Sequence, residues 1–578
     1  MVSRENRPPL PARTKANVTV ATAGVLAMAW WHLALWLTAD GLPISAVDRT
    51  LVALVRLEPL SLGEGVRSPA LPVAVGVWLA LVAVSLGGLI ALIAWRHRRR
   101  AVKGMVAGSA LQRRTGTNGR RAPGEPALLS PIGHYNGQAV RPRTEDTGCV
   151  IAPPRQGKTA YLAVGQVIDA PAAVVATSTK VDLLRLTARL RAERGRVWVF
   201  DPESASGWPE LARWDIVAGC QDVRTAMERS RAMVAARPLE GSKNAGFFTE
   251  AADTVLRCLL HAAALQGLSM RQVLRWARDF DDETPYEILR HHPDAAPGWV
   301  RDLTKFCRGE ARETVSSTDM SLSLVLAPLA DPRVVDLVCP PPPAADAEEE
   351  EEGGARVAVF DPAAFVASTD TLYLLSEGGR TGVAPLITAL VAAVVRAARA
   401  ASQRTATGRL DPPMTFVLDE VANIAPIPDL PQLMADGGGR GMSVWPVAQD
   451  MSQLETRFGV EGAKTIWGAA AVKILMGGSS NDSFLESTSR LVGERRVDRS
   501  SRHYKEAGNV PAFNISTEKE RVLTVAELRQ IPEGRALLLY RDLPAAVIDL
   551  TPWWQRDDAK ALRASHAWVL EREGIPTP

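Results

Sequence analysis

The stretch CVIAPPRQGKTA, from Cys149 to Ala160, constrains the fold of this chain more than any other feature of its sequence. An apolar run leads into a loop, and Gly157-Lys158-Thr159 then opens the helical pattern AYLAVGQVI. A strand, a loop that ends in Gly-Lys-Thr and a following helix form the context that a phosphate-binding loop needs. The stretch therefore predicts an α/β protein with a nucleotide site.

The first half of this loop departs from the usual pattern G-x-x-x-x-G-K-[ST]. Ala152 stands where a glycine is expected, which is costly only if its φ is positive, and Pro153 and Pro154 carry no backbone N–H. Lys158 is expected to reach the β- and γ-phosphates of ATP, and the hydroxyl of Thr159 to hold Mg²⁺. The predicted nucleotide-binding residues are those of the second half: Arg155, Gln156, Gly157, Lys158, Thr159 and Ala160.

A second acidic motif supports this prediction. The run MTFVLDE, Met414 to Glu420, is an apolar strand pattern that ends in two acids, as in a Walker B strand. Asp419 is expected to bind Mg²⁺ through water, and Glu420 to orient or deprotonate the attacking water. The alternative is a strand that ends in two acids by chance.

Two further residues complete the predicted catalytic set. Gln449 follows the apolar run Ser443–Val447, at the position where RecA-like motors place a glutamine near the γ-phosphate. Arg440, in the glycine-rich GGGRG, is the candidate arginine finger, which would reach the nucleotide of a neighbouring subunit. The alternatives are a residue that merely starts a helix and an ordinary exposed turn arginine.

Short apolar runs alternate with longer helical patterns along the chain. Several runs are continuously apolar, as expected for strands buried on both faces of a parallel sheet. The predicted strands are Gly148–Ile151, Ala173–Ala176, Val197–Phe200, Leu372–Leu375, Thr415–Leu418, Ser443–Val447, Val472–Met476 and Ala536–Tyr540. The predicted fold class is α/β: a RecA-like P-loop NTPase domain with an inserted all-α domain, preceded by a two-helix transmembrane hairpin.

The domain boundaries follow from changes in pattern. Residues 222–338 are helical in pattern and poor in strand signals, which predicts an all-α insertion. Residues 339–355 combine prolines, a run of glutamates and two glycines, which predicts a disordered linker. The remaining predicted parts are a membrane anchor (1–103), the two halves of the ATPase domain (104–221 and 356–552) and a C-terminal tail (553–578).

The membrane anchor is predicted from two uncharged stretches. Residues 18–38 and 71–95 are each long enough to cross a bilayer as a helix. Arginines and lysines flank the outer ends of both, so both termini are expected in the cytoplasm and the protein in the plasma membrane, with two passes. A cleaved signal peptide is the alternative for the first stretch, and a buried core helix for the second.

Bulk composition adds little about nucleic acid, because the net charge of +3 argues neither for nor against it. The five cysteines include no C-x-x-C pair, so neither zinc nor a disulfide framework is expected. One local segment, ERRVDRSSRHYKE, is the candidate DNA contact and is expected to be a flexible basic loop. Its basic residues are Arg495, Arg496, Arg499, Arg502 and Lys505. The alternative is a solvated surface loop.

In this order, the motifs resemble those of the coupling ATPases of conjugative and type IV secretion systems, the TraD/TraG family. The resemblance covers most of the chain, including APPRQGKT and the block FVLDEVANIAPIPDLPQLMADGGGRGMSVWPVAQDMSQLETRFG, which matches the family's TraM-recognition region. Thr177–Lys180 (TSTK) departs from the family pattern, where an Asp-Pro-Lys type of turn is common.

The resemblance implies a membrane-anchored homo-hexameric ATPase that uses ATP and Mg²⁺. It would receive single-stranded DNA with a relaxase and relaxosome proteins, and pump DNA or protein into a channel whose inner-membrane components it contacts. An FtsK-type double-stranded DNA translocase is the first alternative, but the block from Asp419 to Gly459 fits the coupling proteins better. A non-hydrolysing substrate receptor is the second, and the presence of Lys158, Asp419 and Glu420 argues against it.

Overall fold

The computed structural model describes residues 105–106, 110–111, 130–237, 245–309, 311–340, 358–378, 382–503 and 512–576, together with Leu79 and Ala83. The chain divides into two compact units, residues 1–100 and 101–578. All elements below belong to the second unit. The predicted membrane spans 18–38 and 71–95 lie outside the described residues apart from Leu79 and Ala83, as do residues 341–355 of the predicted linker.

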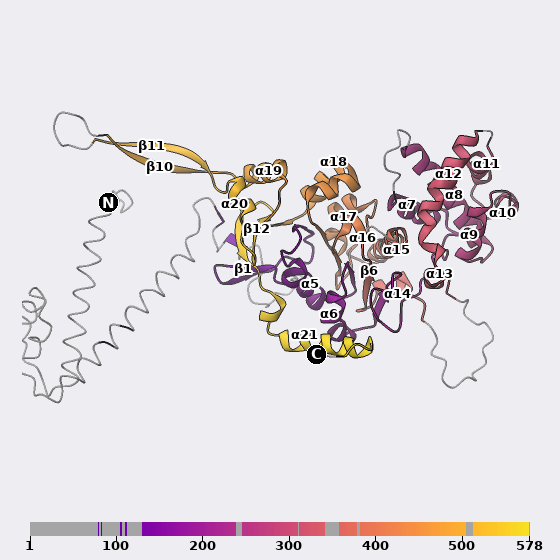
Figure 1. Ribbon diagram of the computed structural model, residues 1–578, viewed down its shortest axis with the longest axis horizontal. Coiled ribbons are helices and arrows are strands. Elements are labelled where there is room, and N and C mark those ends of the chain that lie inside the picture. Colours follow the sequence, from indigo (N-terminus) through magenta and orange to yellow (C-terminus); the bar gives the residue numbers. More distant parts are fainter. Residues whose placement is uncertain are drawn as a thin grey trace, which may run out of the picture. The chain divides into compact units, whose positions relative to one another are not determined.

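A central sheet of eleven strands organises the second unit, in the order β2-β1-β13-β12-β9-β3-β8-β7-β4-β6-β5 (Figure 1). Its strands are β1 (Gly133–Tyr135), β2 (Gln138–Val140), β3 (Gly148–Ile151), β4 (Val174–Ser178), β5 (Val197–Phe200), β6 (Thr371–Leu375), β7 (Met414–Leu418), β8 (Met442–Ala448), β9 (Val472–Met476), β12 (Arg535–Tyr540) and β13 (Ala546–Asp549). Every strand predicted from the sequence is therefore present, with small shifts at the ends.

The sheet is mixed. Neighbouring strands from β9 to β5 run parallel, whereas those from β2 to β9 run antiparallel. The parallel part matches the prediction. The antiparallel edge, with β1, β2 and β13, was not predicted from the sequence.

Each parallel strand is buried on both faces, and its alternate residues enter different cores. Val175 and Phe416 pack in one core, whereas their neighbours Val174 and Val417 pack in another. The first core also contains residues of α15 (Ala384–Gln403), α16 (Val421–Ile424), α17 (Leu430–Asp436) and α18 (Met451–Ala469). The second contains residues of α5 (Val164–Asp169), α6 (Asp182–Ala192) and α21 (Ala559–Arg572). Helices therefore cover both faces of the sheet.

Among the described residues, one helix is long and apolar enough to pass a length-and-hydropathy test for a membrane span, and it is α15. Its side chains Leu386, Leu390 and Val394 are fully buried in the first core. This helix therefore serves as a core element of the sheet domain.

Only helices occur between β5 and β6 in the described part of residues 222–338, as the sequence predicts. They are α7 (Val223–Ala235), α8 (Ala245–Leu265), α9 (Met270–Arg278), α10 (Thr284–His291), α11 (Trp299–Cys307), α12 (Arg312–Leu326), the short η4 (Ala327–Ala330) and α13 (Pro332–Val338). Figure 1 shows α9 to α12 grouped around α8. Inside this group, buried His261 bridges Cys220 O (Nδ1···O 2.8 Å) and the N–H of Ala296 (N···Nε2 3.1 Å).

The C-terminal segment, predicted as a tail, contains a helix that packs on the sheet domain. Leu562 and Val569 of α21 are buried against α6. Arg185 of α6 also forms an ion pair with Glu573 at 2.7 Å. The pattern AKALRASHAWVLER is only weakly amphipathic, and its partner α6 lies far away in the sequence. The docking therefore could not be predicted from the segment alone.

The described part of the segment predicted as a flexible basic loop, up to His503, is instead a strand. Residues of β10 (Glu494–His503) pair with β11 (Ala512–Arg521) in an antiparallel ladder separate from the central sheet (Figure 1). The short helices α19 (Asp482–Val492) and α20 (Val525–Arg529) flank this hairpin, and α14 (Pro362–Val366) precedes β6. The prediction of a loop was wrong because the strand is formed by backbone pairing with β11. Its sequence, ERRVDRSSRH, has almost no alternation of apolar and polar residues that would indicate a strand.

Candidate nucleotide site

The phosphate-loop stretch follows β3, as expected. Ala152 is fully buried and its N–H donates to Ala448 O at 2.9 Å, which continues the pairing of β3 with β8. The positive φ angles in the loop belong to Arg155 (66°) and Gly157 (71°). Ala152 therefore does not need the conformational freedom of the glycine that it replaces.

A helical segment begins directly after Gly157. Thr159–Ala163 form a π-helical turn, η3, which continues into α5, and Tyr161 N–H donates to Gly157 O at 2.9 Å. The first N–H groups of a helix lack partners within it and, together with the loop N–H groups, favour an anion. The start of η3 is therefore the part of the loop best suited to an anion.

Lys158 lies between the two Walker B acids. Its Nζ is 2.6 Å from Glu420 Oε1 and 3.1 Å from Asp419 Oδ1. Burial lowers the pKa of Lys158, but the two carboxylates outweigh it, so the pKa is raised and the ammonium stays charged. Burial of Asp419 raises the pKa of its carboxyl, although Lys158 opposes the shift. One cation and two acids from distant parts of the chain are thus in direct contact.

Glu420 is held by more than the lysine. Gln449 Nε2 donates to Glu420 Oε1 at 2.5 Å, and Asn423 Nδ2 donates to Oε2 at 3.4 Å. The backbone of Glu420 is left-handed (φ 52°, ψ 40°), a strained conformation that accumulates at functional sites. Sequence reasoning missed Asn423, although it lies one helical turn after the acid pair.

The strand order explains why these residues meet. β8 lies between β3 and β7, and all three run parallel. The carboxyl ends of parallel strands share one edge of a sheet, so the loop with Lys158, the end of β8 with Gln449 and the end of β7 with Glu420 converge. The sequence-predicted residues Lys158, Asp419, Glu420 and Gln449 therefore form one cluster.

The predicted magnesium ligands, Thr159 and Asp419, come from the phosphate loop and from the end of β7. Thr159 and Asp419 line the same small hollow as Lys158. A hydroxyl and a carboxylate are hard oxygen ligands of the kind that Mg²⁺ accepts beside phosphates and water. The backbone of Asp419 is fixed by Thr177, whose Oγ1 donates to Asp419 O at 2.7 Å. In the described part of the chain, no group of three His, Cys, Asp or Glu residues could hold a metal unaided.

Arg440 does not join this cluster. It lies in the short helical turn η5 (Gly438–Arg440), before the start of β8, whereas Gln449 follows the end of that strand. Seven residues of strand span roughly 20 Å, so Arg440 lies at the amino ends of the parallel strands, opposite the end that carries Gln449. Its Nε is 3.0 Å from Asp436 Oδ2, and its side chain is about one-third exposed.

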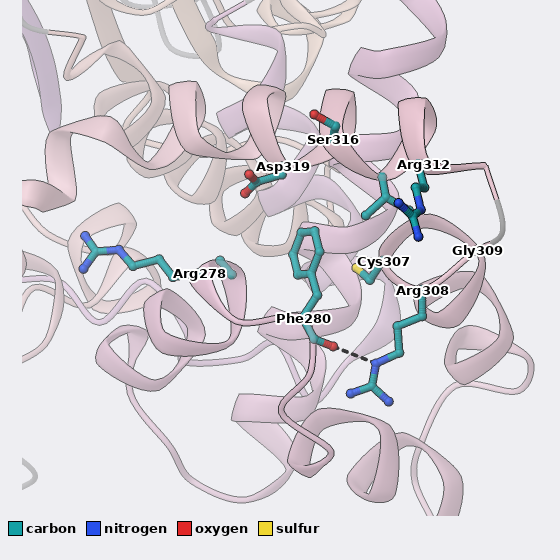
Figure 2. Close-up of a pocket in the computed structure, with 10 residues that line it drawn as sticks. Arg278, Phe280, Cys307, Arg308, Gly309, Arg312, Ser316 and Asp319 are labelled. Carbon is teal, nitrogen blue, oxygen red and sulfur yellow. Dashed lines mark hydrogen bonds between the residues drawn. The ribbon is translucent and has the colours of Figure 1, made fainter.

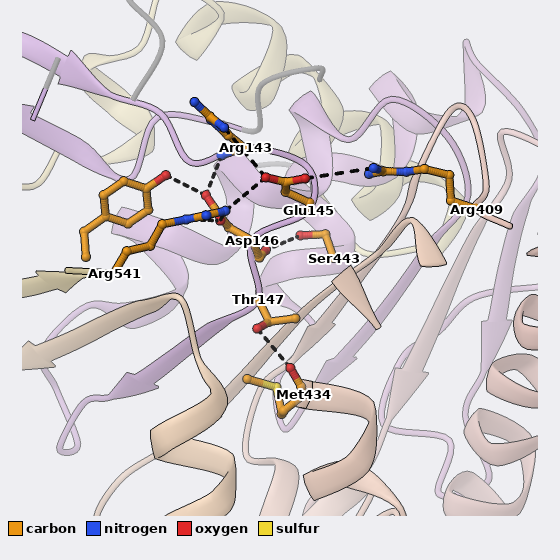
Figure 3. A network of polar contacts seen from close by, with 9 residues as sticks. Arg143, Glu145, Asp146, Thr147, Arg409, Met434, Ser443 and Arg541 are labelled. Carbon is orange, nitrogen blue, oxygen red and sulfur yellow. Dashed lines mark hydrogen bonds and ion pairs between the residues drawn. The ribbon is translucent and has the colours of Figure 1, made fainter. Parts of the chain in front are cut away.

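A polar network lies at the amino ends of β3 and β8, near the turn that contains Arg440 (Figure 3). Fully buried Asp146 accepts from Tyr540 (2.7 Å) and from Arg541 Nε (3.0 Å). Arg541 also contacts Glu145 at 3.1 Å, and a Cβ on Gly438 would lie 2.0 Å from Glu145 O. The turn before Arg440 therefore packs tightly on the residues that lead into β3.

Four of the five DNA candidates lie on strand β10 of the β10–β11 hairpin. Arg495 Nη2 is 3.9 Å from Glu520 Oε2, and Arg496 is exposed. Arg499 and Arg502 occupy positions opposite Ser516 and Phe513 in the ladder. Lys505 lies outside the described residues.

A separate cavity of about 440 Å³ lies within the helical insertion (Figure 2). Arg308 Nε donates to Phe280 O at 2.7 Å, and its Nη1 contacts Glu283 at 2.6 Å. The cavity is also lined by Cys307, and burial raises the pKa of this thiol to about 12. The thiol is therefore protonated at neutral pH.

Comparisons with known proteins agree with the geometry. Residues 91–338 match the family model "Type IV secretory system Conjugative DNA transfer", and residues 413–533 match "TraM recognition site of TraD and TraG". The plasmid coupling protein TrwB in complex with ADP and Mg²⁺ is similar in structure, with a TM-score of 0.53 and 18% identity over 78% of this chain and 93% of that one. TrwB bound to the ATP analogue ADPNP gives a TM-score of 0.54 with the same identity and coverage. No curated protein sequence matches the chain at a significant level.

Proposed function

Because this chain belongs to the TraD/TraG family of conjugative coupling proteins, we propose that it hydrolyses ATP to drive substrate into a conjugative or type IV secretion channel. The observation that carries the proposal is the contact of Lys158 with Glu420 and Asp419 at 2.6 and 3.1 Å. It brings the phosphate-loop lysine and the Walker B acids into one site at the carboxyl edge of the sheet.

The residues divide the chemistry among themselves. Lys158 and the N–H groups of Arg155 to Ala160 would hold the phosphates. Glu420, aligned by Gln449 and Asn423, would accept a proton from the attacking water. Thr159 and Asp419 would hold Mg²⁺, which neutralises phosphate charge when it is bound. The complexes of TrwB with ADP and Mg²⁺ and with ADPNP support ATP and Mg²⁺ as the cofactors.

Exchange of partners at Lys158 would connect nucleotide binding to catalysis. An ammonium has three donors, and two of them face Glu420 and Asp419. Phosphate oxygens that draw the lysine toward themselves would weaken its hold on Glu420. The carboxylate would then be released to act on water while Gln449 still orients it.

The membrane anchor and the hexamer belong to the proposal as well. The uncharged stretches 18–38 and 71–95 with their basic flanks support a two-pass anchor with both termini in the cytoplasm. The place of Arg440 at the far edge of the sheet from Glu420 supports assembly into a ring, in which it would act on the next subunit's nucleotide.

The proposed substrate is single-stranded DNA with its relaxase, and the partners are relaxosome proteins and inner-membrane channel components. The match to a TraM-recognition model over residues 413–533 supports a relaxosome partner. The same residues include the β10–β11 hairpin, whose arginines could contact a phosphate backbone.

The decisive experiment is ATP hydrolysis by the full chain in lipid nanodiscs, with and without single-stranded DNA. Turnover that requires Lys158 and Glu420 and rises with single-stranded DNA is expected. Stimulation by double-stranded DNA alone would favour an FtsK-type translocase. ATP binding without turnover under any condition would overturn the motor and leave a substrate receptor.

A further inference from the structure

We infer that Tyr161 and Trp554 form the platform for the base of the bound nucleotide. The inference rests on the proposed function, because it extends the phosphate site at Arg155 to Ala160. It gives a binding role to the C-terminal segment, where the sequence predicts only a tail.

The orientation of the phosphate chain in the site sets the direction in which the sugar and base extend from it. The γ-phosphate end is marked by Glu420 together with Lys158 and Gln449, which both contact it. The first helical N–H groups after Lys158 serve the phosphates nearer the sugar. The sugar and base therefore continue past Ala160, on the side away from Glu420, where Tyr161 is the next residue.

Tyr161 is fixed against the loop itself. A Cβ on Gly157 would lie 2.6 Å from the Tyr161 ring, and one on Gly534 would lie 3.5 Å from its hydroxyl. The ring is thus packed beside the glycine that precedes Lys158, and the residue remains partly exposed. The base of a nucleotide that extends from the loop at this point would contact the face of the Tyr161 ring.

Trp554 supplies a second ring. Its centroid lies 6.2 Å from that of Tyr161, with the ring planes tilted by 55°. Trp553 packs edge-on against it at 5.8 Å, and Trp554 still remains 45% exposed. Aromatic side chains of this kind are favourable stacking partners for a nucleobase, since every base has a π face.

The segment that carries Trp554 is anchored to the helix after the phosphate loop. Arg556 Nη2 donates to Asp169 Oδ1 of α5 at 2.9 Å, and its Nε donates to Asp558 at 2.9 Å. A Cβ on Gly165, also in α5, would lie 3.0 Å from Arg556 Nη1. These contacts keep Trp554 beside the nucleotide site rather than on a loose tail.

The test separates base binding from phosphate binding. Affinities for Mg-ATP and for inorganic Mg-tripolyphosphate would be measured by calorimetry on the full chain in nanodiscs. Trp554→Leu keeps an apolar side chain but loses the ring, and we expect about tenfold weaker ATP binding with unchanged tripolyphosphate binding. Trp554→Phe should retain most of the affinity. Phe247→Ala, which removes an exposed aromatic of the helical insertion, is the matched control and should change neither.

The outcomes distinguish this inference from the function on which it rests. Lys158→Ala should weaken both ligands, and if it weakens neither, the nucleotide site itself is wrong. If Lys158→Ala behaves as expected but Trp554→Leu binds ATP as tightly as the parent, only the base platform is overturned. Loss of single-stranded DNA binding with ATP affinity intact would also overturn it, by assigning the rings to DNA.

Discussion

Lys158 Nζ and Glu420 Oε1 lie 2.6 Å apart, although 262 positions separate the two residues in the chain. The pair connects the loop that would hold phosphate to the carboxylate that would activate water. This contact couples phosphate binding to water activation, and separate substitutions of Lys158 and Glu420 test the two functions.

Glu420→Gln should abolish hydrolysis while ATP still binds. The amide keeps the size of the side chain, and its oxygen can still accept from Gln449, but it cannot take a proton. Loss of a general base costs about 10²- to 10⁴-fold in rate, so turnover should fall by at least about 100-fold. Phosphate release and ATP affinity would be measured in parallel, with the exposed Glu571→Gln as control. Turnover equal to that of the parent would show that Glu420 is not the base.

Substitutions in the phosphate loop should separate its two halves. Lys158→Ala removes the cation that lies between Asp419 and Glu420, so hydrolysis should disappear and ATP binding should weaken. Ala152→Gly should leave hydrolysis nearly unchanged, because this buried position has no positive φ and donates only its backbone N–H. The added flexibility should cost about 0.5–1 kcal/mol of stability. A large loss of turnover in Ala152→Gly would mean that this corner shapes the site directly.

The sequence allowed most members of the Lys158 cluster to be predicted, but less of their surroundings. Asp419, Glu420 and Gln449 follow the ends of continuously apolar runs, and Lys158 lies in the loop after another. Such runs identify buried parallel strands without knowledge of their order. Asn423 was missed because its role depends on the left-handed turn at Glu420, for which the residue type gives no signal.

The antiparallel parts were harder to predict because their pairing depends on distant or unpatterned partners. β1 and β13 are short, and almost the whole sequence of the ATPase domain lies between them in the chain. They are nevertheless neighbours in the sheet, with His134 opposite Asp549. The hairpin strand β10 (ERRVDRSSRH) is nearly all polar, so no period of two is visible in its hydrophobicity. Its order comes from the ladder with β11.

The N-cap of α7 should give a pH-dependent contribution to stability. Hydrogen bonds from Thr225 and Arg396 lower the pKa of Asp222 to about 2 from its ordinary value of 3.8. A lowered pKa means that the contribution is complete above about pH 4 and is lost as the pH falls toward 2. Asp222→Ala should therefore lower the Tm at pH 7, with about 1 kcal/mol lost for the cap. The difference between variant and parent should shrink in thermal melts at pH 3. A difference that is independent of pH would exclude the charge as its source.

The hairpin arginines should contribute to DNA binding through phosphate contacts. Arg496 is exposed on β10, so Arg496→Ala should weaken single-stranded DNA binding without preference for sequence and reduce the salt slope by about 0.7. Arg521→Ala is the matched control on the same hairpin, since its guanidinium is paired with Glu486 at 2.7 Å. Fluorescence anisotropy over a range of salt concentrations would measure both. Equal salt slopes of DNA binding for the parent and Arg496→Ala would exclude the hairpin as a DNA contact.

Arg440 should act on the nucleotide of a neighbouring subunit. It precedes β8 whereas Gln449 follows that strand, so its side chain cannot reach the site in its own chain. Arg440→Ala and Glu420→Gln should therefore each be inactive alone but should complement each other when co-assembled. Random mixing places an intact Glu420 beside an intact Arg440 at about a quarter of the interfaces in a ring, which sets the expected recovery of ATPase activity. Arg535→Ala, which removes an arginine paired with Asp549 at 2.9 Å, is the control and should be active alone. A mixture no more active than its two components would exclude action in trans. Full activity of Arg440→Ala alone would show that Arg440 only braces the turn through Asp436.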